Sequence, residues 1–290
     1  MKPLISIIIP TYQRCSKLKI ALKSVFSQTY DNYEILIIDD GSKDGTKEMV
    51  ESFNDERIFY IWQNHSGCPA NPRNKGIKAA KGEWVAFLDS DDWWSPNKLK
   101  NCMHYSNNEV DLIYHDLEIA SDKQNFFKRK IIKTRQLKKP VLIDLLLNGN
   151  LISNSSVIVR RKFLISVGYI DEREELTAAE DYHTWLKISK LTDKFLYIPQ
   201  QLGYYFDHSQ NLSKKNMSIP SSNAVSEFRK FLDIKGNLKL EANIKYRAGN
   251  FGYQKNDFVQ AKKNFLFVIK NGDNILRFKS LILLIKMLLR

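Results

Sequence analysis

The fold of this chain can be inferred from residues 84–92, which read Trp84-Val85-Ala86-Phe87-Leu88-Asp89-Ser90-Asp91-Asp92. The first five residues are all apolar, with no polar residue between them, which predicts a buried strand. Three carboxylates follow where that strand should end. Like charges this close raise one another's pKa unless a cation lies between them, and hard oxygen ligands suit Mg²⁺ or Mn²⁺. The alternative, which these residues leave open, is a solvated acidic turn before a helix that begins near Pro96.

Three apolar runs of the same kind precede this strand and are separated from one another by amphipathic segments. The runs cover residues 4–9, 34–38 and 58–62, and the amphipathic segments lie at 16–26, around 49–53 and at 71–80. Apolar strands that alternate with helices indicate a parallel sheet with helices on both faces, joined by right-handed crossovers. We therefore expect an α/β fold.

Polar side chains stand at the carboxyl ends of three of these strands. Thr11 and Tyr12 follow the first strand, Asp39 and Asp40 end the second, and the aspartates of residues 89–92 end the fourth. Open sheets of this kind bind their ligands at the carboxyl ends of the strands. The sequence therefore predicts that three distant segments contribute to one site.

Four motifs in this half of the chain resemble those of the family-2 glycosyltransferases. They are Ile-Ile-Ile-Pro-Thr-Tyr at 7–12, Asp-Asp-Gly-Ser-x-Asp-Gly-Thr at 39–46, Ala-x-x-Arg-Asn-x-Gly-Ile at 70–77 and Phe-Leu-Asp-Ser-Asp-Asp at 87–92. Their order and spacing match the family closely over the first 95 residues or so, and a weaker similarity continues to residue 213. The resemblance implies the GT-A fold: a mostly parallel, Rossmann-like sheet flanked by helices. It also implies a nucleotide-sugar donor and an inverting reaction.

The resemblance divides the chain into two parts. Residues 1–220 would form the GT-A catalytic domain, and residues 221–290 a helical C-terminal region. That region contains one helix pair that resembles a tetratricopeptide unit and ends in a basic amphipathic helix. From residue 243 onward it has ten Lys or Arg residues and two Asp or Glu residues. The terminal helix could pack on the catalytic domain, form a dimer contact or lie beside anionic lipids.

The resemblance also implies roles in donor binding. Pro10, Thr11 and Tyr12 would line the base and ribose pocket. Asp40 would accept a hydrogen bond from a uracil-type ring. Asp39 would support its loop, Arg73 would lie near the diphosphate, and Asp89 near the ribose or donor sugar. The full set of expected donor-binding residues is Pro10, Thr11, Tyr12, Arg14, Asp39, Asp40, Arg73, Asp89 and Ser90. Taken singly, such residues are equally compatible with an ordinary turn or a helix surface.

The metal would be Mn²⁺ or Mg²⁺, with Asp91 as its principal ligand. His208 is the second candidate ligand, although a lone histidine after a strand is also compatible with a plain loop residue. The arginine that the family usually has just upstream of this histidine is absent, since residues 205–207 read Tyr-Phe-Asp. On the acceptor side the resemblance points to Asp92, Trp93 and Trp185.

An acidic pair, Glu180 and Asp181, opens a helix with an apolar face. By itself this pattern is explained by favourable charge at a helix N-terminus. The resemblance assigns the general base to Asp181, with Glu180 as the second candidate and a positioning role as its alternative. An inverting transfer requires one carboxylate to take the proton of the acceptor hydroxyl, whereas retaining hydrolysis also requires a carboxylate nucleophile.

Composition limits the remaining possibilities. The 290 residues carry a formal charge of +13, from 45 Lys and Arg against 32 Asp and Glu, which suggests an anionic membrane, a polyanion or a phosphorylated substrate. Three dispersed cysteines argue against a disulfide framework or a thiolate zinc site. No leader pattern or apolar run of roughly 20 residues is found. We expect a cytoplasmic protein, peripheral at the inner face of the membrane.

The sequence therefore predicts an inverting, metal-dependent glycosyltransferase of surface polysaccharide biosynthesis in the cell envelope. Its donor would be a nucleotide sugar, expected to be a UDP-sugar, and its acceptor a glycan or a lipid-linked glycan. It would also contact an anionic membrane and a second copy of the chain, but no nucleic acid. A nucleotidyltransferase is one alternative, yet residues 10–15 lack the glycine-rich phosphate loop it would need. A nucleic-acid-binding module is a second alternative, but the sequence has no recognisable motif in which basic residues are combined with stacking aromatic residues. A non-catalytic scaffold is a third, but every carboxylate expected in the family is present.

Overall fold

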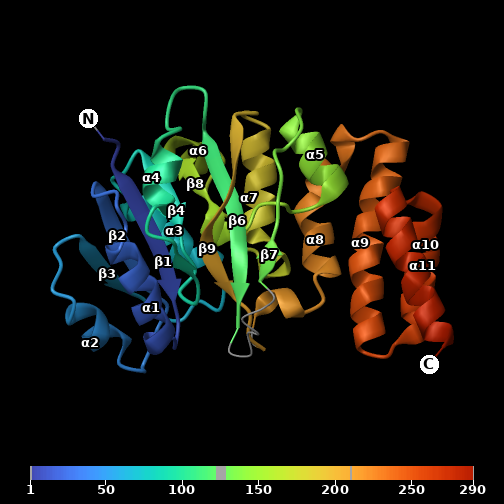
Figure 1. Cartoon of the computed structure of the whole chain (residues 1–290), viewed down its shortest axis with the longest axis horizontal. Helices are drawn as coiled ribbons and strands as arrows, with labels where there is room; N and C mark the ends of the chain where they lie inside the picture. The colour runs from blue at the N-terminus through green and yellow to red at the C-terminus, as the bar shows by residue number, and fades with distance from the viewer. Residues whose placement is uncertain (1, 122–128, 210, 290) are drawn as a thin grey trace.

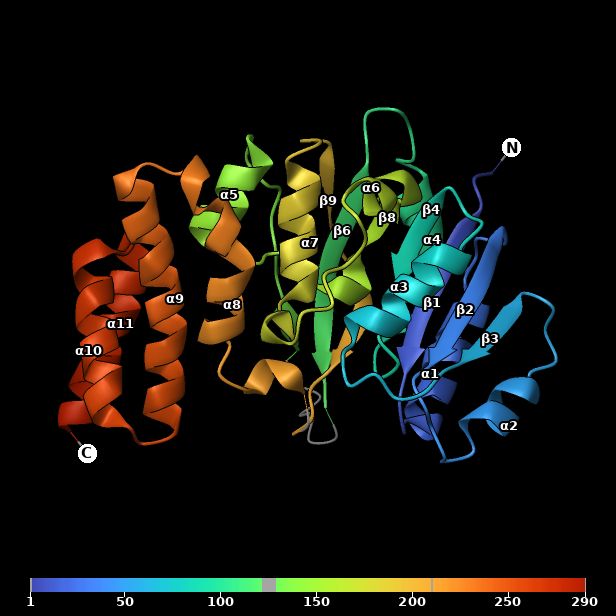
Figure 2. The ribbon, with the colours of Figure 1, turned by 180° about the vertical axis from the view of Figure 1, so that it is seen from behind.

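The computed structural model describes residues 2–121, 129–209 and 211–289, and within them one mixed sheet is flanked by helices (Figures 1 and 2). The strands are β1 (Ile5–Thr11), β2 (Tyr33–Asp39), β3 (Ile58–Trp62), β4 (Trp84–Phe87), β5 (Trp93–Trp94), β6 (Leu112–Ala120), β7 (Lys130–Ile132), β8 (Ile158–Arg160) and β9 (Phe195–Phe206). The α-helices are α1 (Cys15–Phe26), α2 (Thr46–Glu51), α3 (Ala70–Ala79), α4 (Lys98–Met103), α5 (Val141–Asn148), α6 (Arg161–Ser166), α7 (Glu180–Ser189), α8 (Ser218–Val225), α9 (Ile234–Gln254), α10 (Phe258–Asn271) and α11 (Asn274–Leu288).

The strand order is β3-β2-β1-β4-β8-β6-β9-β5, with β7 beside β6. The first four strands are parallel, in register from Ile5 opposite Tyr33 to Thr11 opposite Asp39. Beyond β4 the sheet becomes mixed, because β8 runs antiparallel to both β4 and β6, while β6 and β9 are parallel. The α/β sheet with flanking helices is thus confirmed, and its parallel part is the segment whose strands the sequence pattern indicated.

Both faces of β1, β2 and β4 are buried, which explains why these strands read as continuous apolar runs. The edge strand β3 is only half-buried. Side chains alternate between the faces along a strand. On β1, Ile8 faces the core under α3, α5 and α7, whereas Ile7 and Ile9 face the core under α1 and α4. The strand ends are therefore held from both sides, and the polar residues that follow them are fixed in place.

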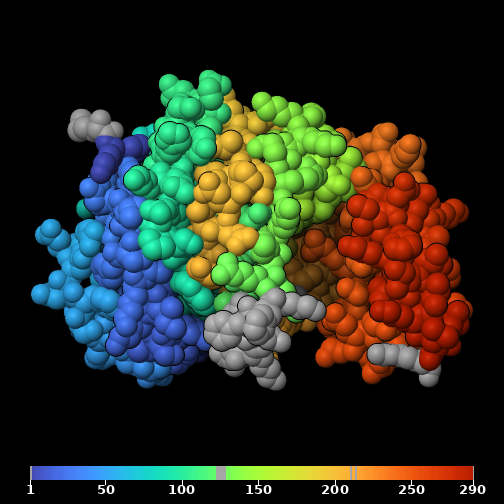
Figure 3. Space-filling model, in the orientation of Figure 1, coloured from blue at the N-terminus to red at the C-terminus, as the bar shows by residue number. Residues whose placement is uncertain are grey.

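The C-terminal helices form one end of the molecule and dock on the sheet-containing part through α9 (Figures 1 and 3). Leu240 and Ile244 of α9 are buried in the core beneath α5 and α8. Helix α10 packs closely on α9, where Gly249 leaves room for the ring of Phe265. No helix formed by the described residues combines the length and the apolar character needed to cross a bilayer.

Candidate active site

A cavity of about 620 Å³ opens at the carboxyl edge of the parallel strands. Its walls come from the loops after β1 and β4, the start of α3, the segment 150–155, the start of α7 and one turn of α9. The sequence-predicted residues that line it are Pro10, Thr11, Tyr12, Arg14, Asp40, Arg73, Asp89, Ser90, Asp91, Asp92, Glu180 and Asp181. Those that do not line it are Asp39, Trp93, Trp185 and His208.

One end of the cavity is formed by the loops after β1, β2 and β3. The Tyr12 ring stacks on the His65 ring with 3.8 Å between centroids, and it remains 41% exposed. The Asp40 carboxylate accepts hydrogen bonds from Gln63 Nε2 (2.6 Å) and from the backbone and hydroxyl of Ser66 (3.0 to 3.1 Å). An exposed aromatic face beside a fixed carboxylate suits a nucleobase, which stacks and hydrogen-bonds at its edge.

Asp39 lies behind this end and is fully buried. Its carboxylate accepts the Tyr60 hydroxyl at 2.5 Å and the backbone N–H of Ser42 at 2.7 Å. These bonds tie the loop after β2 to β3. The structure therefore gives Asp39 a supporting position, in line with the loop-holding role expected for it, and no direct access to a ligand.

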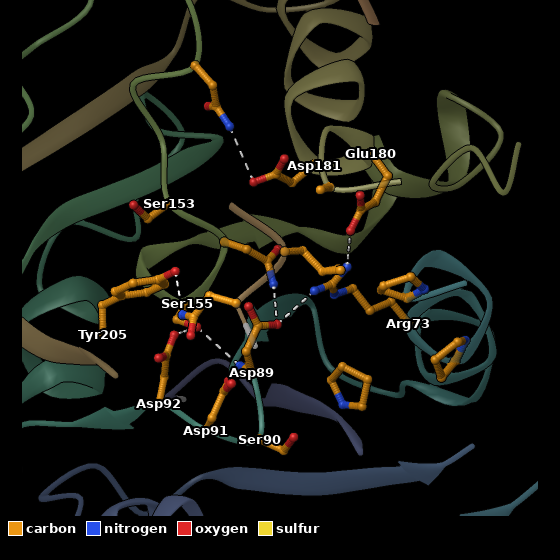
Figure 4. Close-up of a pocket in the computed structure, with 18 of the residues that line it drawn as sticks. Arg73, Asp89, Ser90, Asp91, Asp92, Ser153, Ser155, Glu180, Asp181 and Tyr205 are labelled. Carbon is orange, nitrogen blue, oxygen red and sulfur yellow. Dashed lines mark hydrogen bonds and ion pairs between the residues drawn. The ribbon is translucent and has the colours of Figure 1, made fainter. Parts of the chain in front are cut away.

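Arg73 lies at the centre of the site, between two carboxylates (Figure 4). It is 6% exposed and donates to Asp89 at 2.8 Å and to Glu180 at 2.6 Å. Burial acts to lower the pKa of Arg73, but the two carboxylates outweigh it and the pKa is raised. Because Glu180 is committed to this ion pair, its geometry is that of a positioning residue.

Asp91 has two cationic or potentially cationic neighbours. Its Oδ2 accepts from Arg14 Nη1 at 2.7 Å and lies 2.9 Å from His208 Nε2. His208 therefore contacts Asp91, the predicted metal ligand, although His208 itself does not line the cavity. A carboxylate and an imidazole fit Mn²⁺ or Mg²⁺ when substrate phosphates complete the shell. Within the described residues no group of three or more His, Cys, Asp or Glu side chains could hold an ion alone.

Of the two neighbouring residues expected on the acceptor side, Asp92 lines the cavity and Trp93 does not, and both have partners within the protein. The Asp92 carboxylate is 3% exposed and accepts from Ser155 Oγ at 2.6 Å and from the backbone N–H of Phe206 at 3.0 Å. Burial, followed by the charges of Asp89 and Asp91, raises its pKa. The Trp93 ring stacks on Tyr204 with 5.3 Å between centroids. The Asp92 carboxylate therefore bonds to the backbone of β9 and the Trp93 ring packs on the same strand, so both side chains stabilise this part of the fold.

Trp185 was also expected on the acceptor side, and that expectation is wrong. The residue is 1% exposed and packs on Phe87 with 6.2 Å between ring centroids. It lies on the buried face of α7, one turn after the acidic pair. Its contribution is to hold the helix that presents Asp181 to the cavity.

Asp181 lines the cavity from the first turn of α7 (Figure 4). Its Oδ1 accepts from the N–H of Tyr182 at 2.6 Å, and its Oδ2 lies 3.3 Å from Asn150 Nδ2. Burial, and then the charge of Glu180, raise its pKa to about 7. A carboxylate with a pKa near the working pH can both hold and release a proton, as a general base must.

The sequence reasoning missed several residues that the fold brings to the cavity. Ser155 and Asn154 support Asp92 and Asp89, and Asn150 supports Asp181. His65 stacks on Tyr12. Arg247 reaches the cavity from α9, 157 positions after Ser90. The segment 150–155 is short and polar, so no periodicity marks it, and nothing local in α9 distinguishes Arg247 from its other basic residues.

Comparison with known proteins gives a consistent result. The profile described as "Glycosyl transferase family 2" matches residues 6–168. The Escherichia coli protein WfgD, described as UDP-Glc:alpha-D-GlcNAc-diphosphoundecaprenol beta-1,3-glucosyltransferase, is 28% identical over 270 residues. That alignment covers 93% of this chain and 98% of WfgD, so it extends into the C-terminal helices.

Two solved structures share the fold. S. aureus TarS 1–349 in complex with UDP-GlcNAc has a TM-score of 0.66 at 19% identity, covering 94% of this chain and 82% of that one. Full-length TarS is longer, and the alignment spans 50% of it. The mannosyltransferase PcManGT of Pyrobaculum calidifontis in complex with GDP-Man and Mn²⁺ has a TM-score of 0.63 at 15% identity, covering 96% and 78% of the two chains. At these identities the likeness establishes the GT-A type of fold.

Proposed function

The chain belongs to glycosyltransferase family 2, and from this premise we propose that it transfers a sugar, with inversion, from a UDP-sugar to a hydroxyl of a lipid-linked glycan. The observation that carries the proposal is that Arg73, Asp91 and Asp181, from three distant segments, surround one cavity. WfgD, similar along nearly its whole length, is described with a UDP-Glc donor and a diphosphoundecaprenol-linked acceptor. A product of this kind would enter a surface polysaccharide of the cell envelope.

The nucleotide binds at the end formed by the loops after β1 and β2. Tyr12 and His65 offer a stacking surface, and Asp40 is held in one orientation by Gln63 and Ser66. A carboxylate fixed before binding loses little conformational entropy when a base donates to it. The donor diphosphate then extends from this end toward Asp91 and Arg14.

Asp91 and His208 would hold the divalent cation that the reaction uses. When bound, such an ion neutralises charge on a diphosphate leaving group, which is most valuable as the glycosidic bond breaks. The Arg14 guanidinium, 2.7 Å from the same carboxylate oxygen, adds positive charge at this point. The pairing of Asp91 with His208 supports this assignment beyond the aspartate motif itself.

Asp181 removes the proton from the acceptor hydroxyl. The other acidic residues around it are committed, since Glu180 and Asp89 pair with Arg73 and Asp92 bonds to Ser155. Asp181 forms no ion pair with a described residue, and its Oδ2 is held only weakly, by Asn150 at 3.3 Å. The Oε2 of Glu180 is buried without a partner among the described residues, but its Oε1 holds that side chain against Arg73. One available carboxylate suits direct displacement at the sugar carbon, whereas a double displacement would need a second as nucleophile.

The outer face of α11 would bring the enzyme to the membrane that holds its acceptor. Among its described residues six apolar side chains are exposed, and they recur at helical spacing along one face: Ile275, Phe278, Leu281, Ile282, Ile285 and Leu288. The exposed Leu289, which follows the helix, continues this face. At 100° per residue, Lys279 and Lys286 flank this face on one side and Arg277 on the other. An apolar face bordered by basic residues matches an anionic lipid surface.

Sedimentation with lipid vesicles tests the membrane contact. The protein should sediment with vesicles that contain phosphatidylglycerol, and less with phosphatidylcholine alone. Ile282→Glu with Ile285→Glu should abolish sedimentation, while the same change at Val259 and Leu266 of α10 should not. A concentration-dependent dimer that these α11 changes dissolve, without vesicle binding, would show that the face binds a second copy instead.

A screen of UDP-, GDP- and dTDP-sugars with Mn²⁺ tests the proposed function. Release of nucleotide diphosphate should be found with UDP-sugars and should stop when the metal is chelated. Asp91→Ala should lose both turnover and metal-dependent UDP binding, because its carboxylate is the expected ligand. A protein that binds none of these nucleotides with any divalent metal would contradict the proposal.

A further inference from the structure

Arg247 is the residue of helices α9 to α11 that lines the cavity, and the expected base, Asp181, lines the same cavity. Asn243, one turn earlier on α9, donates to the carbonyl of Leu147 at 2.9 Å and so fixes α9 against the end of α5. A Cβ built on Gly149 would lie 3.0 Å from Arg247 Nη2, so the guanidinium passes over this glycine. The next residue, Asn150, bonds to Asp181.

Arg247 differs from the other arginines of the cavity because it forms no ion pair within the described residues. Of the basic side chains that line the cavity, Arg14 and Arg73 form ion pairs with carboxylates. Arg247 and Lys133 form none with any carboxylate in the described parts of the chain. The negative end of the α5 dipole favours a cation near Gly149, which explains how Arg247 is held there without using its five donors.

Lys133 lies on the other side of the same loop. The hydroxyl of its neighbour Thr134 donates to the carbonyl of Leu151 at 2.6 Å, which joins the segment after β7 to residues 149–151. The loop that carries Asn150 is therefore bordered by Arg247 through Gly149 and by the Lys133 segment through Leu151. Two unpaired cations that line one cavity beside the same loop favour an anion.

We propose that Arg247 and Lys133 form an anion subsite for the diphosphate of the acceptor, on the far side of Asp181 from the donor nucleotide. This rests on the proposed function. In a sugar-diphosphate-lipid acceptor, one sugar ring separates the attacking hydroxyl from the diphosphate. With the hydroxyl at Asp181, the diphosphate would lie about one sugar ring away, toward Asn150 and Arg247. The donor nucleotide binds at the opposite end, near Asp40 and Tyr12.

The subsite also explains why the C-terminal helices belong to the enzyme. Helix α9 would read the diphosphate head of the acceptor, and α11, packed behind it through α10, would lie at the lipid surface in which the acceptor is anchored (Figure 2). The specificity for a lipid diphosphate would thus reside outside the part of the chain that binds the donor. Arg247 would act as a specificity-determining residue.

Calorimetric titration of decyl diphosphate into the protein saturated with UDP and Mn²⁺ tests the subsite. UDP occupies the donor diphosphate position, so binding reports a second anion site. Arg247→Gln should weaken decyl diphosphate binding by about tenfold or more, as expected for loss of a charge-assisted bidentate contact, and Lys133→Ala by a smaller factor. Lys235→Ala removes a charge from an exposed position of the same helix and should change nothing. Decyl maltoside should not bind.

The outcomes separate this inference from the proposed function. If UDP binding itself is absent, the donor assignment fails. If UDP binds and Arg247→Gln leaves decyl diphosphate affinity unchanged, the subsite is wrong. If Arg247→Gln weakens UDP and decyl diphosphate in parallel, Arg247 acts on the donor diphosphate and the acceptor assignment is overturned. Equal melting temperatures of wild type and variant show that a loss of binding is not a loss of fold.

Discussion

The two ends of the cavity are built in different ways. At the strand-end region, formed by the loops after β1, β2 and β4, Asp39, Asp40, Asp89 and Asp92 all have strong partners within the protein. At the loop-and-helix region, formed by residues 149–155, the start of α7 and α9, Asp181 keeps a weakly held oxygen and Arg247 forms no ion pair with a described carboxylate. In the strand-end region the polar groups are paired within the protein, whereas in the loop-and-helix region we expect the substrate to supply the missing partners.

The difference teaches where binding is prepared and where chemistry takes place. Carboxylates that already accept hydrogen bonds within the protein have little freedom to move, so we expect them to lose little conformational entropy when a nucleotide binds. Groups with free hydrogen-bonding capacity in a partly dry cavity interact strongly with whatever enters, and the pKa of Asp181 is raised there. Substitutions should therefore reduce stability in the strand-end region and activity in the loop-and-helix region.

Asp181→Asn should give the largest effect. The amide has the same shape but cannot accept the proton, so turnover should fall by roughly 10²- to 10⁴-fold. UDP affinity should not change. The raised pKa of Asp181 means that the fold disfavours its ionised form, so the variant should melt no lower than wild type at pH 8. Transfer at the wild-type rate would show that another group is the base.

Arg73→Met should give the next largest effect, and on stability. It leaves the buried carboxylate of Glu180 and the partly exposed carboxylate of Asp89 without their counter-ion. This loss should lower the free energy of unfolding by about 3 kcal/mol, measured by urea denaturation at pH 7.5. Arg173→Met, at a half-exposed surface pair with Asp171, is the matched control and should cost less than about 1 kcal/mol. Equal losses would show that the buried position of Arg73 between two carboxylates does not contribute to stability.

The pH dependence should be the gentlest of the three effects and locates the base. Asp181 acts when deprotonated, so kcat/KM should fall about tenfold for each pH unit below its pKa of about 7 and level off above it. In the unfolded chain an aspartate titrates near about 3.9, so the fold binds the extra proton between these values and the contribution of Asp181 to stability decreases as pH rises through that window. An acidic limb near pH 4 would contradict this environment.

The strand-end region was predictable because its signals are local. Each parallel strand is marked by its own apolar run, and the polar residues that follow it must then meet at one edge of the sheet. Thr11, Tyr12, Asp40 and Asp91 were therefore found without coordinates. Trp93 and Trp185 were misassigned because an aromatic residue near a motif reads the same whether it faces a ligand or the core.

The sequence by itself determined the α/β fold, the family and the edge of the sheet at which the acidic motifs collect, since these follow from periodicities of a few residues. Only the tertiary structure decided which acidic residue is available. Glu180 is paired with Arg73 across 107 positions of the chain, and Asp181 next to it is not. It also decided that α9 docks with Arg247 over Gly149. Such pairings depend on how whole helices pack, and no local pattern specifies that.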